Sequence, residues 1–311
     1  MSNLQKALES GKFALTAEMA PPKGCDFSHQ MKMVELVKGK VDAVNVTDFQ
    51  SASLKASSLA LCIMIKQAGL EPVLQMTGRD RSRMAIQGDF LGASAFGIEN
   101  LLALTGDHTT VGDCKESKPV FDLDSVGILQ AAKCLEAGTD CGGNALAGDA
   151  PKYYLGASVT PVYDPVELQL IKMRKKIEAG AKFFQTQGVY ETESMKPFME
   201  LAEKYGVYLM AGIIPIKNAG MAKYMSANVP GIYIPDEIIN RIKDSATKNL
   251  NPNDPEDVQK KMKSKNQKLE GVAVSAELIA EFKSKGLCHG AHIMAIGAEE
   301  LVPDIIAQAG L

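Results

Sequence analysis

Polar side chains end several strand-like segments of this chain, and their types suit proton transfer and ligand orientation. The first segment, Phe13–Glu18, is an apolar run that ends in a carboxylate, and Pro21 and Pro22 soon follow it. A carboxylate at the end of a buried strand is costly unless it is paired, solvated or used in chemistry. Similar polar groups end the later segments, namely Thr47, Gln75, Thr105, Asp107, Ser158, Thr160, Gln185 and Gln187.

Several other reaction classes lack the residues that they need. No lysine stands at a predicted strand end, which argues against Schiff-base chemistry, and no Gly-x-Ser-x-Gly motif is present. Cys134 and Cys141 are the only close cysteine pair, and Cys288-His289 with His292 has no carboxylate close by in the sequence, so we expect no metal site. The polar strand ends therefore favour an enzyme that transfers protons and orients a flat, polar, amide-rich ligand.

Composition limits the partners of the protein. The 311 residues are 46% apolar, and 34 basic against 37 acidic residues give a net charge of −3. The charges are mixed along the chain, so we expect neither a nucleic-acid nor a membrane partner. The six scattered cysteines favour free thiols. We expect a soluble, cytoplasmic protein, because no apolar run has the length of a membrane span and the N-terminal residues do not resemble a signal peptide.

Eight strand-like segments alternate with helical ones along the chain. The predicted strands are Phe13–Glu18, Ala43–Thr47, Pro72–Thr77, Asn100–Leu104, Tyr153–Ser158, Lys182–Gln187, Val207–Ile213 and Ala291–Ala295. The predicted helices are Ser2–Ser10, Ser28–Lys38, Leu54–Ala68, Arg81–Leu91, Asp124–Leu135, Pro165–Ala179, Glu191–Lys204, Ala219–Met225, Pro235–Asp244 and Pro255–Lys285. Glycines that follow helices and the Asp254-Pro255 pair supply the expected C-caps and an N-cap.

This alternation predicts an α/β protein, specifically a (β/α)₈ TIM barrel that forms a single domain over residues 1–311. A doubly wound open sheet is the alternative. It would normally carry a glycine-rich fingerprint after the first strand, where this chain has Met19-Ala20-Pro21-Pro22. In a barrel, the carboxyl ends of all strands meet at one rim, so the polar strand ends are expected to surround a common pocket.

The motif Thr16-Ala17-Glu18-Met19-Ala20-Pro21-Pro22 resembles the opening motif of the methylenetetrahydrofolate reductases. Further motifs follow in the family's order and spacing across almost the whole chain; they are Val44–Thr47, Leu104–Asp107, Lys175–Ala181, Gln185–Gln187 and Ala211–Pro215. Each motif alone is weak, and the ordered set is specific. The resemblance implies a barrel that holds a flavin, which passes a hydride from N5 to the methylene carbon of 5,10-methylenetetrahydrofolate.

The resemblance also implies roles for individual residues. Glu18 matches the catalytic acid that protonates folate N10, and Asp107 matches the carboxylate beside flavin and pterin, where it accepts pterin N–H groups. Gln187 is expected to hydrogen-bond the pterin, and Thr47 to line the same pocket. The flavin-binding residues implied are Thr47, Gln75, Thr105, Gly106, Asp107, Phe121, Asp122, Thr160 and Lys176, with Lys176 as the phosphate partner.

The sequence departs from the family pattern at both the cofactor and the electron-donor positions. Gln75 and Thr160 each stand where relatives have His, and Thr105 stands where some have Arg. Several charged contacts to the cofactor are therefore missing, which leaves open whether the flavin is FAD or FMN. Ala219 stands where the NADH-using type has an aromatic residue, and the stretch from His292 through Met294 to Gly297 replaces a pattern with Tyr, Thr and Asn. The electron donor is therefore either NADH or a redox partner subunit, and the resemblance to two-subunit enzymes implies a Cys-rich zinc and iron–sulfur subunit.

Two other functions fit the same residues. A pterin- or corrinoid-linked methyltransferase barrel would use the same acidic and amide recognition of a pterin. A non-catalytic barrel subunit of a redox complex would not use these acidic and amide residues in any reaction.

Overall fold

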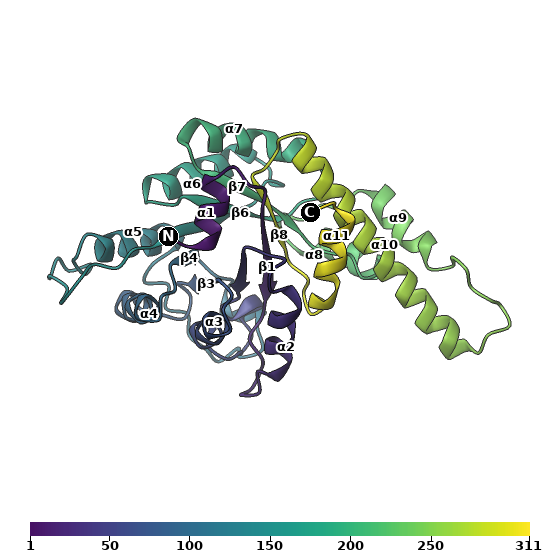
Figure 1. Cartoon of the computed structure of the whole chain (residues 1–311), viewed down its shortest axis with the longest axis horizontal. Coiled ribbons are helices and arrows are strands. Elements are labelled where there is room, and N and C mark those ends of the chain that lie inside the picture. Colours follow the sequence, from purple (N-terminus) through teal and green to yellow (C-terminus); the bar gives the residue numbers. More distant parts are fainter.

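Eight parallel strands close into a barrel in a computed structural model that describes residues 1–311 (Figure 1). Each strand pairs with its neighbours in chain order, and β8 pairs with β1 to complete the ring. The strands are β1 (Ala14–Met19), β2 (Ala43–Val46), β3 (Pro72–Thr77), β4 (Asn100–Leu104), β5 (Tyr154–Val159), β6 (Phe183–Gly188), β7 (Tyr208–Ile213) and β8 (Gly290–Ile293). The predicted (β/α)₈ fold class is thereby confirmed.

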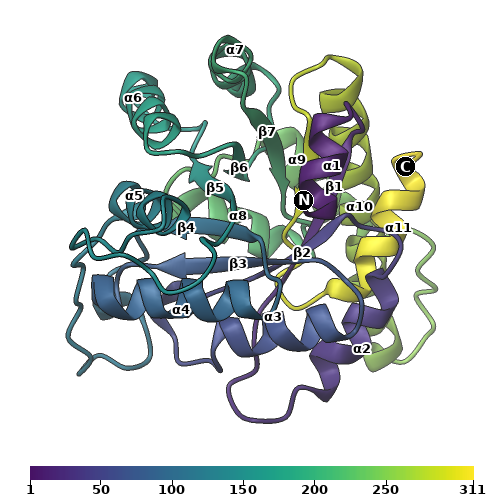
Figure 2. The same ribbon diagram turned by 60° about the vertical axis from the view of Figure 1, so that its left-hand side comes forward.

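Helices cover the outside of the barrel, and Figure 2 shows α3 and α4 beside β3. The helices are α1 (Asn3–Glu9), α2 (Ser28–Val37), α3 (Ser58–Gln67), α4 (Arg83–Ala95), α5 (Ser125–Glu136), α6 (Val166–Glu178), α7 (Lys196–Tyr205), α8 (Ala219–Asn228), α9 (Asp236–Ser245), α10 (Glu256–Ser284) and α11 (Val302–Gln308). Short 3₁₀ turns are η1 (Gln50–Ala52), η2 (Thr109–Val111), η3 (Glu193–Met195) and η4 (Glu299–Leu301). None of the helices combines the length and apolar composition that a membrane span requires.

The predicted strands agree with the observed ones to within two residues at either end. Helix ends differ by up to five residues, the most at the start of α7, and α11 was not predicted. The expected N-cap at Asp254 is wrong, because α10 begins directly after Pro255 and no side chain caps its first turn. Gly69 and Gly206 follow their helices with φ of 79° and 63°, a backbone conformation that favours glycine.

Strand alternation separates the inside of the barrel from the helix layer. In β1, Leu15, Ala17 and Met19 belong to the large apolar cluster that the strands form with the surrounding helices. The intervening residues Ala14, Thr16 and Glu18 face the interior. Moving along the strands, the inward-facing positions change from apolar to polar, and this change sets where a ligand can bind.

The N-terminal end of the barrel is closed by α1. Leu4, Ala7 and Leu8 of this helix join the first inward-facing residues of the strands in a second buried cluster, whose strand members are Ala14, Ala43, Val73, Leu102, Tyr154, Phe183 and Met210. Within the cluster the rings of Tyr154 and Phe183 stack with centroids 5.1 Å apart. This end of the barrel is therefore filled by side chains.

Helix α9 and the first half of α10 extend beyond the barrel, as Figure 1 shows. Arg241 of α9 holds the two helices together, because its guanidinium pairs with Glu270 and Glu277 of α10 at 2.7 Å each. The buried residues of α10 all lie in its later half, from Gly271 to Phe282. The Arg241 pairs lie at and beyond the middle of α10, and near the end of the projecting half Asn266 Nδ2 and Gln267 Nε2 donate to the backbone oxygens of Lys248 and Ile242 at 2.7 and 3.4 Å.

Candidate active site

A cavity of about 570 Å³ opens at the carboxyl ends of the strands. This is the end of a (β/α)₈ barrel at which active sites lie. Most of the residues predicted for the site line this cavity; they are Glu18, Thr47, Gln75, Thr105, Gly106, Asp107, Thr160, Lys176 and Gln187. The two acids, Glu18 and Asp107, therefore face one common space.

Glu18 lies next to the last residue of β1 and is almost completely buried, with 9% of its surface exposed. Gln75 Nε2 donates to its Oε2 at 3.2 Å, and His292 Nε2 lies 3.6 Å from the same oxygen. Gln50 Nε2 reaches Oε1 at 3.5 Å. No lysine or arginine pairs with this carboxylate, so its polar neighbours are the amides of Gln75 and Gln50 and the ring of His292.

A buried hydrogen-bond network lies beside Glu18 in the barrel interior. Gln185 Nε2 donates to Thr16 Oγ1 at 3.2 Å and to Asn45 Oδ1 at 3.1 Å, while Asn45 Nδ2 donates to Gln185 Oε1 at 2.6 Å. Thr16 Oγ1 lies 2.9 Å from His292 Nδ1. The Thr16 hydroxyl can donate to or accept from Nδ1, and the opposite ring nitrogen, Nε2, faces Glu18.

The sequence analysis named Gln185 only as a polar strand end without a role and did not assign Thr16, Asn45 or His292 to the site, although a signal for the first three of these residues was present. Each of the first three lies two residues before a predicted site residue in the same strand. Side chains two apart in a strand point to the same face, so a polar residue at that spacing belongs to the barrel interior. His292, considered above only for a metal site, lies in the middle of β8 and faces the same interior.

Asp107 follows β4 at the mouth of the cavity, where its side chain is exposed and its carboxylate makes no ion pair. Its backbone oxygen is fixed by Arg79 Nη1, which donates to it at 3.0 Å. The preceding Gly106 has φ of +90°, and an added Cβ would lie 3.2 Å from both Arg79 and Thr77. A tight turn that only glycine fits thus presents a free carboxylate to the cavity.

Two further polar side chains offer unused hydrogen-bonding capacity to the cavity. The hydroxyl of Thr47 is buried and has no hydrogen-bond partner. Gln187 accepts the N–H of Gly188 at its own Oε1, at 3.0 Å, so its Nε2 remains available as a donor. An unpartnered buried polar atom is costly, and one that lines a cavity is suited to a ligand.

Lys176 of α6 brings a positive charge to another part of the cavity wall, together with Lys172. Its Nζ donates to the backbone oxygen of Ser158 at 2.6 Å. Burial, with Lys172 as a second cause, lowers the pKa of Lys176 to about 8. An ammonium that is poorly solvated and lies beside a second lysine favours an anion as its partner.

Phe121 and Asp122 do not line the cavity. The carboxylate of Asp122 is occupied by Arg83, whose Nη2 and backbone N–H donate to it at 2.7 and 2.8 Å. These hydrogen bonds lower the pKa of Asp122 to about 2. Phe121 stacks on His108 with ring centroids 6.3 Å apart. The structure therefore does not bring these two predicted cofactor contacts together with the other site residues.

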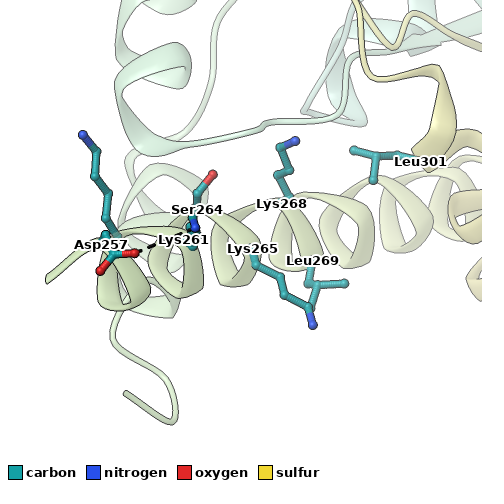
Figure 3. A pocket seen from close by; sticks show the side chains of 8 residues that line it. Asp257, Lys261, Ser264, Lys265, Lys268, Leu269 and Leu301 are labelled. Atoms are coloured by element: carbon teal, nitrogen blue, oxygen red, sulfur yellow. Dashed lines mark ion pairs between the residues drawn. The ribbon is translucent and has the colours of Figure 1, made fainter. Parts of the chain in front are cut away.

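A groove of similar volume, about 580 Å³, lies far from these residues on the projecting half of α10 (Figure 3). Its walls are mainly the lysines of this helix; they are Lys260, Lys261, Lys265 and Lys268. The weak pairing of Lys261 with Asp257, at 3.8 Å, is its one ion pair. A row of exposed lysines on one helix is typical of a solvated face, so we place the site in the barrel.

No group of three or more His, Cys, Asp or Glu side chains in the structure is arranged to hold a metal ion, and all six cysteines are free. His289, adjacent to the buried Cys288, accepts the backbone N–H of Leu209 at its Nδ1, at 3.0 Å.

The chain is similar to two curated reductases. A probable methylenetetrahydrofolate reductase (NADPH) of Caenorhabditis elegans is 23% identical over 274 residues, which cover 87% of this chain and 36% of that protein. Methylenetetrahydrofolate reductase 2 of Schizosaccharomyces pombe is 24% identical over 279 residues, which cover 86% of this chain and 40% of that protein. The chain thus spans less than half the length of either relative.

Among solved structures, an uncharacterized protein from Clostridium thermocellum that binds two copies of 5-methyl-5,6,7,8-tetrahydrofolic acid superposes with a TM-score of 0.59. The superposition covers 98% of this chain and 97% of that one at 15% sequence identity, a likeness that shows the fold alone. The methylenetetrahydrofolate reductase family model matches residues 3–310, so this chain belongs to the methylenetetrahydrofolate reductase family.

Proposed function

We propose that the protein reduces 5,10-methylenetetrahydrofolate to 5-methyltetrahydrofolate with a bound flavin as the redox group. The observation that carries this proposal is the shared cavity of Glu18 and Asp107, one buried and one exposed, in a chain of this family. A buried acid can give a proton to the substrate, while an exposed carboxylate at the mouth can orient it. The two acids therefore suit two different tasks in one reaction.

The residues around the cavity fit a flavin. Thr47 offers a buried hydroxyl without a partner, and Lys176 offers a poorly solvated ammonium for a phosphate. Ser125 begins α5, where helix geometry favours negative charge, and its N–H donates at 3.2 Å to the Oγ1 of Thr105, which follows β4. We propose Gln75, Gly106 and Thr160 as further contacts. The flavin, FAD or FMN, would supply hydride chemistry when bound.

On the substrate side, Asp107 and Gln187 would hold the pterin. A carboxylate with no ion pair can accept two adjacent pterin N–H groups, and the free Nε2 of Gln187 can donate to a ring acceptor. The Gln187 side chain is held by the Gly188 N–H, and the backbone of Asp107 is held by Arg79 at its carbonyl oxygen. The substrate would therefore meet groups that are already oriented.

Glu18 would deliver the proton that opens the folate ring at N10. Gln75 donates to the carboxylate at 3.2 Å, and the His292 ring lies 3.6 Å from the same oxygen, so these two side chains would hold the group in orientation. With no cation paired to Glu18, protonation of the carboxylate leaves no buried positive charge behind. These contacts thus support Glu18 as the general acid of the proposed reaction.

For the electron donor, we infer that NADH is used weakly by the isolated chain. Met294 lines the cavity, and Ala219 packs against the apolar cluster around the barrel, so neither offers a ring that could stack on nicotinamide. A redox partner subunit is the alternative donor, and the family resemblance gives it as Cys-rich with zinc and iron–sulfur groups. Any such metal group would be contributed by that partner.

The test is reoxidation of the bound flavin by substrate. The purified chain is loaded with FAD or FMN, reduced anaerobically with dithionite and mixed with 5,10-methylenetetrahydrofolate. We expect the absorbance of oxidised flavin to return as 5-methyltetrahydrofolate forms. A chain that binds neither flavin would overturn the proposal. Methyl transfer without flavin would identify a methyltransferase, and a complex that keeps full activity with Glu18→Gln would identify an accessory subunit.

A further inference from the structure

A buried arginine lines the cavity and has no role in the mechanism above. Arg79 lies two residues after β3 and is 1% exposed, which places it among the largest fully buried side chains of the protein. A charged side chain is this deeply buried only where its charge and its hydrogen-bond donors are satisfied. Its partners therefore indicate what it is built to hold.

The guanidinium of Arg79 joins three loops at the mouth of the barrel. Nε and Nη2 bind the carboxylate of Asp80 at 3.0 and 2.7 Å, which balances the charge. Nη1 donates to the backbone oxygen of Asp107 at 3.0 Å, and Nη2 donates to that of Phe49 at 3.1 Å. One planar side chain thus fixes the loop after β2 and the loop after β4 relative to β3.

The loop that carries Asp107 closes on Arg79 at both of its ends. The side chain of Arg79 donates to the Asp107 carbonyl. The backbone oxygen of Arg79 accepts the N–H of Val120 at 2.7 Å. Both ends of the segment 107–120 are therefore hydrogen-bonded to Arg79. The position of the Asp107 carboxylate is set by this anchor, because that carboxylate has no partner of its own.

The loop after β2 needs such an anchor because its backbone is strained. Phe49, Ser51 and Ala52 have φ of 45°, 55° and 53°, in the left-handed region. This conformation is unfavourable for residues other than glycine and persists where the surroundings hold it. The two loops also touch directly, since a Cβ on Gly112 would lie 1.8 Å from the Ala52 oxygen.

We propose that Arg79 is the positioning residue of Asp107, and that it sets folate recognition by holding the Asp107 loop against the strained loop after β2. This inference rests on the proposed function, because it takes folate as the ligand of Asp107. The effect is geometric, since Asp80 already neutralises the charge of Arg79. A lysine would keep the charge without the planar fork that reaches both carbonyl oxygens.

The test measures folate binding and turnover in Arg79→Gln and Arg79→Lys, with Asp107→Asn as the reference variant. Arg83→Gln is the matched control, because Arg83 also makes a bidentate pair, with Asp122, and lies outside the cavity. Calorimetric titration with 5-methyltetrahydrofolate reads binding without any turnover. Flavin binding to each variant reports whether the rest of the cavity is intact.

We expect Arg79→Gln to raise the dissociation constant of the folate about tenfold and to slow flavin reoxidation by ~10²-fold, since small misplacements cost that much. Arg79→Lys should recover stability more than folate affinity. Adding Asp107→Asn to Arg79→Gln should cause little further loss, because coupled residues are not additive.

Folate affinity equal to wild type in both Arg79 variants, or losses that multiply in the double variant, would overturn the inference. If the wild-type chain binds folate but shows no flavin-dependent turnover, the proposed function fails while the comparison of Arg79 with Asp107 still stands. If only Arg79→Lys can be purified, its folate affinity against that of Arg83→Gln decides the question.

Discussion

The two ends of the barrel are formed by the same eight strands and have opposite character. At the N-terminal end, Leu4 and Leu8 of α1 pack on a ring of apolar inward-facing residues and leave no space. At the C-terminal end, the inward-facing positions are mostly polar and surround a cavity of about 570 Å³. One end supplies apolar burial, and the other supplies polar groups with free capacity.

A buried hydroxyl without a partner occurs at each end, and the surroundings give the two different meanings. The hydroxyl of Tyr154 is enclosed in the apolar cluster, where the ring stacks on Phe183. Thr47 is a lining residue of the cavity, so its side chain adjoins open space. The comparison teaches that an unsatisfied polar atom indicates a binding site only where space adjoins it. Substitutions at the two ends should accordingly separate stability from activity.

The largest effect is expected for Glu18→Gln at the open end. Removing a general acid should lower turnover by ~10²–10⁴-fold, whereas the free energy of unfolding should change little because glutamine keeps the shape and can still hydrogen-bond Gln75. Stopped-flow reoxidation of reduced flavin and thermal unfolding measure the two quantities. Glu35→Gln, on the exposed face of α2, is the control. Full turnover by Glu18→Gln would remove the acid from its proposed role.

At the closed end, Leu8→Ala should lower the free energy of unfolding by ~2–5 kcal/mol, because it opens a space in a filled core. Turnover per folded molecule should stay near wild type. Denaturant unfolding measures the first quantity, and Leu36→Ala, whose side chain is 36% exposed, should stay within about 0.5 kcal/mol of wild type. A specific loss of turnover in Leu8→Ala would show that the two ends are not independent.

Lys176→Met should stabilise the flavin-free protein and weaken its flavin binding. The pKa of Lys176 is lowered to about 8, below its value in the unfolded chain, so the unfolded state binds more protons above that pH. The free energy of unfolding of the wild type should therefore rise between about pH 8 and the usual lysine pKa. The variant should not show this rise, and its free energy of unfolding at neutral pH should be ~2 kcal/mol higher than that of the wild type.

Unfolding measured as a function of pH, with flavin binding by fluorescence quenching, tests this prediction. The control is Lys175→Met, because Lys175 lies on the exposed face of the same helix. In the wild type, flavin affinity should fall as pH passes about 8 and the ammonium loses its proton. Unchanged flavin affinity in Lys176→Met would exclude this residue as the phosphate partner.

The smallest effects distinguish the two unpartnered hydroxyls. Thr47→Val should weaken ligand binding by about tenfold and leave stability equal or slightly higher, because it removes a hydrogen bond that only a ligand can complete. Tyr154→Phe should change neither flavin nor folate affinity and should not destabilise the protein. Parallel calorimetry and thermal unfolding compare them. Equal effects of the two substitutions on ligand affinity would contradict the assignment of Thr47.

Much of this arrangement could be predicted from the sequence, for identifiable reasons. The strands were located because apolar residues face the helices and alternate with interior residues, and because glycines and prolines end the segments between them. Glu18 and Asp107 could be placed together because parallel strands bring their carboxyl ends to one rim. Helix α11 was missed because seven residues after a 3₁₀ turn carry little periodic signal.

The contacts behind the site could not be predicted in the same way. Arg79 follows a strand end by two residues, and a polar loop residue gives no sign that its side chain is buried or which carbonyl oxygens it binds. Asp122 was assigned to the cofactor by resemblance, and nothing in the sequence indicates that Arg83 occupies its carboxylate. Such pairings depend on loop geometry in three dimensions.

The alternation within β1 also limits how the length of this protein can vary. A single residue inserted between Thr16 and Glu18 would turn the carboxylate toward the helices and bring an apolar neighbour into the interior. Insertions and deletions are therefore expected in the loops between strands and helices, whereas the six residues of β1 are fixed in number by the face on which Glu18 must lie.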